Sequence, residues 1–106
     1  MDISKCDWKL YMEKVPEWQE RYMERLIDKY IEMLSSDEPA SEKFWVLEKQ
    51  VKSDKRHPGV LIEMRKSKAI YDIARFIMLS VITFKDLAPF SDELKQNVNE
   101  ITRQRG

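Results

Sequence analysis

The chain contains only two glycines, one cysteine and one histidine among its 106 residues. With glycine at positions 59 and 106 alone, it cannot form the glycine-rich loop by which many nucleotide-binding proteins hold phosphates. A single cysteine, Cys6, excludes a disulfide within the chain and a cysteine-rich zinc site. A single histidine, His57, excludes a metal site with several histidines, and the Glu-x-x-His pattern of di-iron bundles does not occur. We therefore predict no metal and no cofactor.

The sequence also lacks a segment that could cross a membrane. Its most apolar stretch, residues 69–82, is shorter than the ~20 residues that span a bilayer, and it contains Asp72 and Arg75. Residues 1–14 are charged throughout and show no signal-peptide pattern. We therefore expect a cytoplasmic protein with no membrane partner.

Charged residues are abundant at 36%, beside 42% hydrophobic residues. Few glycines and prolines together with many Glu, Lys, Leu, Ile and Met residues are typical of helices. Three Trp, four Tyr and four Phe residues supply enough apolar surface for a core, which argues against disorder. We predict a single all-α domain over residues 1–106, a compact bundle of four main helices with one or two short helical segments.

Turn and capping signals divide the chain into these helices. Residues 1–15 are a lead-in with a short helix that Pro16 ends, and a long helix follows over residues 17–34. Residues 35–39 form a turn before a helix at 41–53, and the loop 54–59 leads to the next helix. Thr83 and Asp86 have nearly the spacing of a capping box, which predicts a short helical turn. Residues 91–93 cap a last helix, before a frayed end at 103–106.

A long apolar helix predicted over residues 59–81 is the expected centre of the bundle. It is apolar on nearly every side, so other helices must surround it. Within it, Asp72 and Arg75 are either a structural ion pair or charged groups that face a ligand cavity. The residues expected to pack around this helix are Trp18, Tyr22, Leu26, Tyr30, Phe44, Leu47, Leu94 and Val98.

No group of residues predicts a reaction. Cys6 and His57 would form a nucleophile and base only if the fold brought them together. The carboxylates are scattered along amphipathic faces. A helical enzyme that binds a small dicarboxylate needs several basic residues that point inward. Four basic residues could take that role, but they match no known motif: Arg65, Lys66, Lys68 and Arg75. We therefore predict that the chain is not an enzyme and has no catalytic residue.

Charge is unevenly distributed, although the net charge is zero. Six basic and two acidic residues between positions 52 and 68 leave +4, whereas eight acidic and four basic residues between 13 and 38 leave −4. The basic segment is a candidate contact for phosphate groups or nucleic acid, partly because a helix N-terminus expected there attracts anions. The alternative is a solvated surface that pairs with the acidic helix. The candidate residues are Lys52, Lys55, Arg56, His57, Arg65, Lys66 and Lys68.

The aromatic and methionine content exceeds what a core of this size requires. Aromatic residues and methionine are enriched at the centres of protein interfaces. We therefore predict a non-enzymatic interaction or regulatory module that acts through an apolar-aromatic helical face, with a second copy as the expected partner in a homodimer. A weak nucleic-acid or phosphate binder that uses residues 52–68 is the alternative, and its binding must fall steeply with salt.

Several strings of residues carry a resemblance. They are Pro-Ala-Ser-Glu-Lys-Phe-Trp-x-Leu-Glu from Pro39, Asp-Lys-Arg-His-Pro-Gly-Val-Leu-Ile-Glu-Met-Arg from Asp54, Ile-Thr-Phe-Lys-Asp-Leu from Ile82 and Phe-Ser-Asp-Glu-Leu-Lys from Phe90. Together they make residues 16–101 similar to a group of small uncharacterised proteins from Gram-positive bacteria. The resemblance implies a bacterial, cytosolic and helical domain. It implies no catalytic residue, since that group has no established activity.

Overall fold

The computed structural model describes residues 2–105, and these residues form helices without any strand. The elements are α1 (Lys5–Leu34), α2 (Ala40–Asp54), the 3₁₀ helix η1 (Lys66–Lys68), α3 (Ala69–Met78), the 3₁₀ helix η2 (Phe84–Leu87) and α4 (Asp92–Arg105). The predicted all-α class with four main helices and short helical segments is therefore confirmed. The frayed end was predicted over residues 103–106, but α4 continues through Arg105, and Gly106 lies outside the described residues.

Contacts divide the chain into two compact units rather than the single compact bundle that the sequence predicts. One unit, which we call the terminal unit, consists of the residues up to Trp18 together with those from Glu63 onward. The other, the hairpin unit, is Gln19–Ile62. None of the helices within residues 2–105 is both long and apolar enough to cross a bilayer.

Helix α1 runs without a break through Pro16, so the predicted helix end at this proline is wrong. A proline inside a helix removes one hydrogen bond and costs about 3 kcal/mol. Pro16 itself is exposed, but Val15 and Trp18 on either side of it are buried. Burying two large apolar side chains contributes roughly 1.5–3 kcal/mol each, which offsets the cost of the proline.

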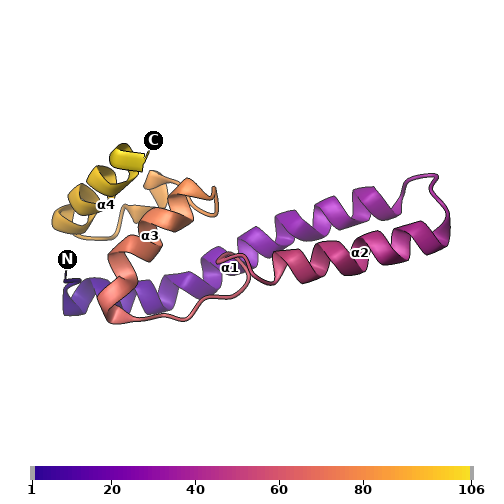
Figure 1. The fold of residues 1–106 in the computed structure, drawn as a ribbon. Coiled ribbons are helices and arrows are strands. Elements are labelled where there is room, and N and C mark those ends of the chain that lie inside the picture. The colour runs from indigo at the N-terminus through magenta and orange to yellow at the C-terminus, as the bar shows by residue number, and fades with distance from the viewer. Residues whose placement is uncertain (1, 106) are drawn as a thin grey trace. The chain divides into compact units, whose positions relative to one another are not determined.

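The core of the terminal unit is built around Trp18. Its ring lies 5.8 Å from that of Phe76 in an edge-to-face contact, 6.1 Å from that of Phe90 and 6.4 Å from that of Tyr11. Such ring pairs stabilise a core beyond the area that they bury. Helices α3 and α4 pack against each other in this unit (Figure 1). Leu94 and Val98, which the sequence predicts as packing residues, are buried, and so is Ile101.

The predicted helix over residues 59–81 is wrong at both ends. Residues 61–65 are not helical, and α3 begins only at Ala69, after η1. It ends at Met78 because Ser80 adopts a left-handed φ of 61°. The backbone N–H of Val81 then donates to the carbonyl of Phe76 at 2.8 Å, and that of Ser80 to the carbonyl of Ile77 at 3.0 Å, which is the hydrogen-bond pattern of a Schellman cap.

Short-range capping predicts the connection after α3 correctly. The side chain of Asp86 accepts a hydrogen bond from the backbone N–H of Thr83 at 2.9 Å, and the Thr83 side chain caps the third residue in return. This capping box holds the turn η2 where the sequence predicts it.

The hairpin unit pairs the second half of α1 with α2, which runs antiparallel beside it after the turn at residues 35–39 (Figure 1). The bounds of α2 agree with the predicted helix at 41–53 to within one residue at each end. The hydroxyl of Tyr30 on α1 donates a short hydrogen bond to the carboxylate of Asp54 at the end of α2, and Gln50 donates to the same carboxylate at 3.2 Å. Asp54 therefore ties the two helices together.

Candidate functional site

Helix α2 is the least buried of the long helices. Not one of its residues, all of which are described, is buried. The exposed fractions of Phe44, Trp45 and Val46 are 61%, 65% and 50%. Phe44 was predicted to pack around a central helix, and this assignment is wrong. Single exposed apolar residues need no explanation, but a helix with a large exposed aromatic pair does.

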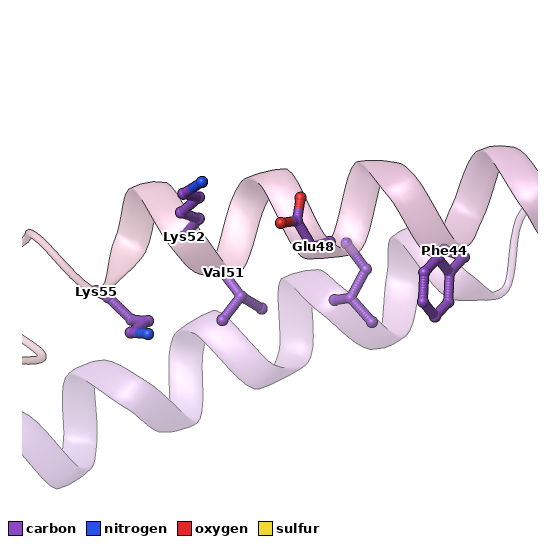
Figure 2. Close-up of a pocket in the computed structure, with 6 residues that line it drawn as sticks. Phe44, Glu48, Val51, Lys52 and Lys55 are labelled. Carbon is purple, nitrogen blue, oxygen red and sulfur yellow. The ribbon is translucent and has the colours of Figure 1, made fainter.

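Two hollows lie beside one another along the hairpin. The first, of about 440 Å³, is lined by Phe44, Leu47, Glu48, Val51, Lys52 and Lys55 (Figure 2). The second, of about 160 Å³, is lined by Met23, Leu26, Ile27, Tyr30, Val51, Asp54, Lys55 and Val60. Val51 and Lys55 line both hollows, so we treat the two hollows as one surface. We call it the hairpin trough, and we define its apolar lining as Met23, Ile27 and Tyr30 from α1 with Phe44, Leu47 and Val51 from α2.

The apolar lining continues along α1 beyond the hollows. Ile27 is 52% exposed, Ile31 is 57% exposed and Leu34 is 40% exposed. Spacings of four and three residues place these side chains on one side of the helix. Both helices of the hairpin therefore present apolar side chains that their own unit leaves uncovered.

Charged residues border the trough differently on its two helices. On α1, the exposed acids Glu20, Glu24 and Asp28 follow one another at intervals of four residues, which places them in a row. On α2, Lys52 and Lys55 line the first hollow and are exposed. Figure 2 shows Phe44 and Val51 on the edge of α2 towards α1, with Lys52 pointing away from that edge.

His57 lies in the turn after α2. Its ring stacks on that of Tyr22 at 4.6 Å and 8°, and its Nδ1 accepts a hydrogen bond from the backbone N–H of Gly59 at 3.0 Å. Gln19 donates to the carbonyl of Pro58 at 3.0 Å. Gly59 is required here by close approach, because a Cβ atom at this position would lie 2.4 Å from the Tyr22 ring. In the bond from Gly59, Nδ1 of His57 is the acceptor and the backbone N–H is the donor.

The predicted basic residues are divided between the two units. Lys52, Lys55, Arg56 and His57 belong to the hairpin unit, whereas Arg65, Lys66 and Lys68 belong to the terminal unit. No helix begins at Gly59, so the helix N-terminus expected beside the loop to attract an anion is not there. Arg65 pairs with Glu63 at 3.0 Å. The seven residues are therefore described as two groups, one in each unit.

Asp72 and Arg75 form an ion pair along one turn of α3, with 3.9 Å between the carboxylate and the guanidinium. Asp72 is buried, and this burial raises the pKa of its carboxyl, although Arg75 and Lys68 oppose the shift. The buried hydroxyl of Tyr11 has no hydrogen-bond partner among the described residues. Burial, and secondarily the charge of Asp72, raises the pKa of Tyr11. These contacts belong to the core of the terminal unit and resemble structural packing.

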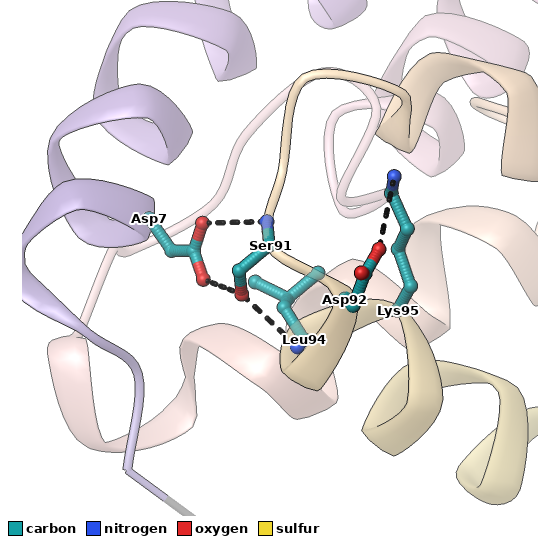
Figure 3. A network of polar contacts seen from close by, with 5 residues as sticks. All are labelled: Asp7, Ser91, Asp92, Leu94 and Lys95. Atoms are coloured by element: carbon teal, nitrogen blue, oxygen red, sulfur yellow. Dashed lines mark hydrogen bonds and ion pairs between the residues drawn. The ribbon is translucent and has the colours of Figure 1, made fainter.

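A second polar cluster joins the start of α1 to the start of α4 (Figure 3). The buried carboxylate of Asp7 accepts hydrogen bonds from the backbone N–H of Ser91 at 3.1 Å and from its hydroxyl. The Ser91 oxygen in turn accepts the backbone N–H of Leu94 at 3.2 Å, which is an N-cap of α4.

Residues that could bind a metal ion or act as a thiol nucleophile are a further kind of candidate site. Among residues 2–105, no three His, Cys, Asp or Glu side chains are grouped so as to hold a metal ion. Cys6 is an exposed thiol of the terminal unit, while His57 belongs to the hairpin unit. The two residues of the nucleophile pair considered from the sequence therefore lie in different units.

The sequence contains one signal for exposed apolar surface on α2 that our interpretation missed. Phe44, Trp45 and Val46 are consecutive, and consecutive residues on a helix point about 100° apart. Three such residues cannot all face one neighbouring helix. At least one must be exposed or covered by a second partner.

Comparisons with known proteins add no assignment. No protein-family model matches the chain, and comparison with curated proteins and with solved structures likewise gives no significant match.

Proposed function

We propose that the chain is a non-enzymatic protein-interaction module and that the hairpin trough is its binding surface. The observation that carries this proposal is the absence of any buried residue in α2, despite the presence of Phe44, Trp45 and Val51. Removing apolar surface from water stabilises by roughly 25 cal/mol per Å², so a partner that covers these side chains gains free energy from each of them.

Two helices alone cannot cover their own apolar surfaces. Leu26 and the Tyr30–Asp54 hydrogen bond close one edge of the pair, but Ile27, Phe44 and Val51 remain accessible. Helical hairpins normally bury this surface against further helices. In the hairpin unit no further helix exists. This supports a partner protein over a small ligand.

The nucleic-acid and phosphate alternative has weaker support. Its residues are divided between two units, and the helix N-terminus that it requires beside His57 is missing. We also propose a cytoplasmic location, because an exposed free cysteine such as Cys6 is compatible with a reducing compartment. The bacterial origin implied by the resemblance stays a prediction.

The accessibility of the trough can be tested with an apolar fluorescent dye, 1-anilinonaphthalene-8-sulfonate. We expect saturable dye binding at the lowest protein concentrations, where any assembly has dissociated. Phe44→Ser should reduce the dye signal at least about twofold, because Phe44 is a large part of the apolar lining.

The matched control is Val46→Ser, which removes a similarly exposed apolar side chain of α2 that does not line the trough. Its dye signal should equal that of the wild type. An absence of dye binding at every concentration, or equal losses in the two variants, would show that the trough is not an open binding surface.

A further inference from the structure

We infer that the occupant of the hairpin trough is the trough of a second copy of this chain. The two hairpins then form an antiparallel four-helix bundle in which α1 of each copy lies against α2 of the other. This inference rests on the proposed function, since it names the partner of the same surface. Three features of the hairpin support it: the spacing of its apolar residues, its unfinished helix count and the placement of its charges.

The apolar residues along the trough have the spacing of helix bundles. On α1, Met23, Ile27, Tyr30 and Leu34 follow one another at intervals of four, three and four residues. On α2, Phe44, Leu47 and Val51 follow at intervals of three and four. This alternation is the seam pattern by which helices pack side by side at a shallow angle. All of these residues except Leu34 line the trough.

The number of helices also fits a symmetric pair. A two-fold axis makes each copy present the same surface to the other, so a trough lined by both helices of a hairpin can pack against itself. Two hairpins then supply the four helices of a standard bundle. The apolar lining comes from α1 and α2 in similar measure, as a self-complementary surface requires.

Charge decides which helix of the partner each helix meets. The acidic row of Glu20, Glu24 and Asp28 lies on α1, whereas Lys52 and Lys55 lie at the end of α2 and line the first hollow. If α1 meets α2 of the partner, acids face lysines at both edges of the interface. If α1 met α1, acids would face acids and lysines would face lysines, and this repulsion would weaken the association. Complementarity therefore selects the first arrangement.

Glu48 is the one acid that lines the first hollow beside these lysines. It reduces the positive charge of the α2 border without cancelling it, because one acid stands beside two lysines, Lys52 and Lys55. Arg21, Arg25 and Lys29 each follow one of the three acids in the sequence, but consecutive residues of a helix point about 100° apart, so these bases form a separate row on α1. The two borders therefore keep opposite signs.

The test combines mass measurement by light scattering with two charge-reversed variants. The first is Glu24→Lys with Asp28→Lys, and the second is Lys52→Glu with Lys55→Glu. The wild type should form a dimer whose apolar contact persists at high salt. Each variant alone should dimerise about tenfold more weakly at low salt, because like charges then face each other. A mixture of the two variants should recover dimerisation, since every reversed charge meets its opposite.

The controls separate this interface from other causes of association. Lys49→Glu with Lys66→Glu changes the net charge by the same amount outside the trough and should leave the dimer unaffected. Helical circular dichroism should stay unchanged in all variants, which reports that they fold. Phe44→Ser should dissociate the dimer, whereas Val46→Ser should not.

Each alternative outcome overturns a different statement. A wild type that stays monomeric at all concentrations while its trough binds the dye refutes the second copy and leaves the proposed function standing. A dimer that survives Phe44→Ser uses another surface, which refutes this inference. A dimer that both charge reversals leave as tight as the wild type pairs α1 with α1, or lacks the charge contacts, and refutes the arrangement. A monomer without dye binding refutes the proposed function itself.

Discussion

Asp7 should stabilise the terminal unit by more than any other charged residue whose contacts we have described. Its carboxylate is 5% exposed and accepts two hydrogen bonds from Ser91, one from the backbone N–H at 3.1 Å and one from the hydroxyl. The Ser91 oxygen also caps α4 through the N–H of Leu94. We therefore consider three variants: Asp7→Ala, Ser91→Ala and the double variant.

The expected magnitudes follow from these bonds. A hydrogen bond to a charged group contributes roughly 1.5–3 kcal/mol, and Asp7→Ala removes two of them. Ser91 lies on the exposed side, so water partly replaces the lost acceptor, and we expect a cost of about 3 kcal/mol rather than the upper sum. Ser91→Ala removes one bond to the carboxylate and the cap of α4, which together cost about 2.5 kcal/mol.

The hydroxyl-to-carboxylate bond is shared, so the two costs must overlap. The double variant should cost about 1.5 kcal/mol less than the sum of the single variants. Urea unfolding, followed by the fluorescence of the buried Trp18, measures all three free energies of unfolding. The control is Asp92→Ala, which removes an exposed acid that lies 3.9 Å from Lys95 (Figure 3) and should change stability by less than about 0.5 kcal/mol. Additive costs within about 0.5 kcal/mol would refute this account of the cluster.

Three further predictions concern single positions. Ser80→Gly should raise the free energy of unfolding by about 0.5–1 kcal/mol, because glycine adopts the left-handed φ of 61° without strain, and an unchanged melting temperature would contradict this. Gly59→Ala should cost about 1–3 kcal/mol in urea unfolding, since its Cβ would lie 2.4 Å from the Tyr22 ring, and wild-type stability would contradict the close approach. Burial raises the pKa of Asp72, so its charged form opposes folding as the pH rises above the ordinary aspartate value. Asp72→Asn should therefore gain stability relative to the wild type as the pH rises through that window, and a pH-independent difference in unfolding free energy would contradict the sign.

Local signals predicted the fold where local interactions determine it. The turn at residues 35–39, the bounds of α2 and the capping box of Thr83 and Asp86 depend on neighbouring residues alone, and the structure confirms them. The predicted helix end at Pro16 was wrong because the effect of a proline on a helix depends on which neighbouring side chains are buried. The burial of Trp18 against Phe76 cannot be read from the residues around the proline.

The prediction of a central helix over residues 59–81 was wrong for a related reason. An apolar stretch preceded by Pro58 and Gly59 looks like one helix, and nothing in its periodicity reveals that residues 61–65 are not helical. The left-handed residue that ends α3 is Ser80, where glycine or asparagine would have signalled a helix end. Without either residue, no local signal indicates where this helix ends.

The type of candidate surface was predicted from the sequence, but its position was not. An apolar-aromatic face was predicted, yet Phe44 and Leu47 were assigned to a core. A stripe with a helical period looks the same whether a helix of the same chain or of another chain covers it. Of the predicted basic residues, only Lys52 and Lys55 line the trough, because their positions on α2 fall beside Val51. Distinguishing these cases requires the burial of each side chain, which only the structure supplies.

The two units differ in how completely each buries its own apolar residues. The terminal unit encloses an aromatic core around Trp18, with Tyr11 and Phe76 almost fully buried. In the hairpin unit, Leu26 is the only large apolar side chain that is buried among its described residues. A substitution on the trough therefore removes little that stabilises the isolated chain, whereas one near Trp18 opens a core. This separation is what a binding surface requires, because its residues can be selected for a partner without endangering the fold that carries them.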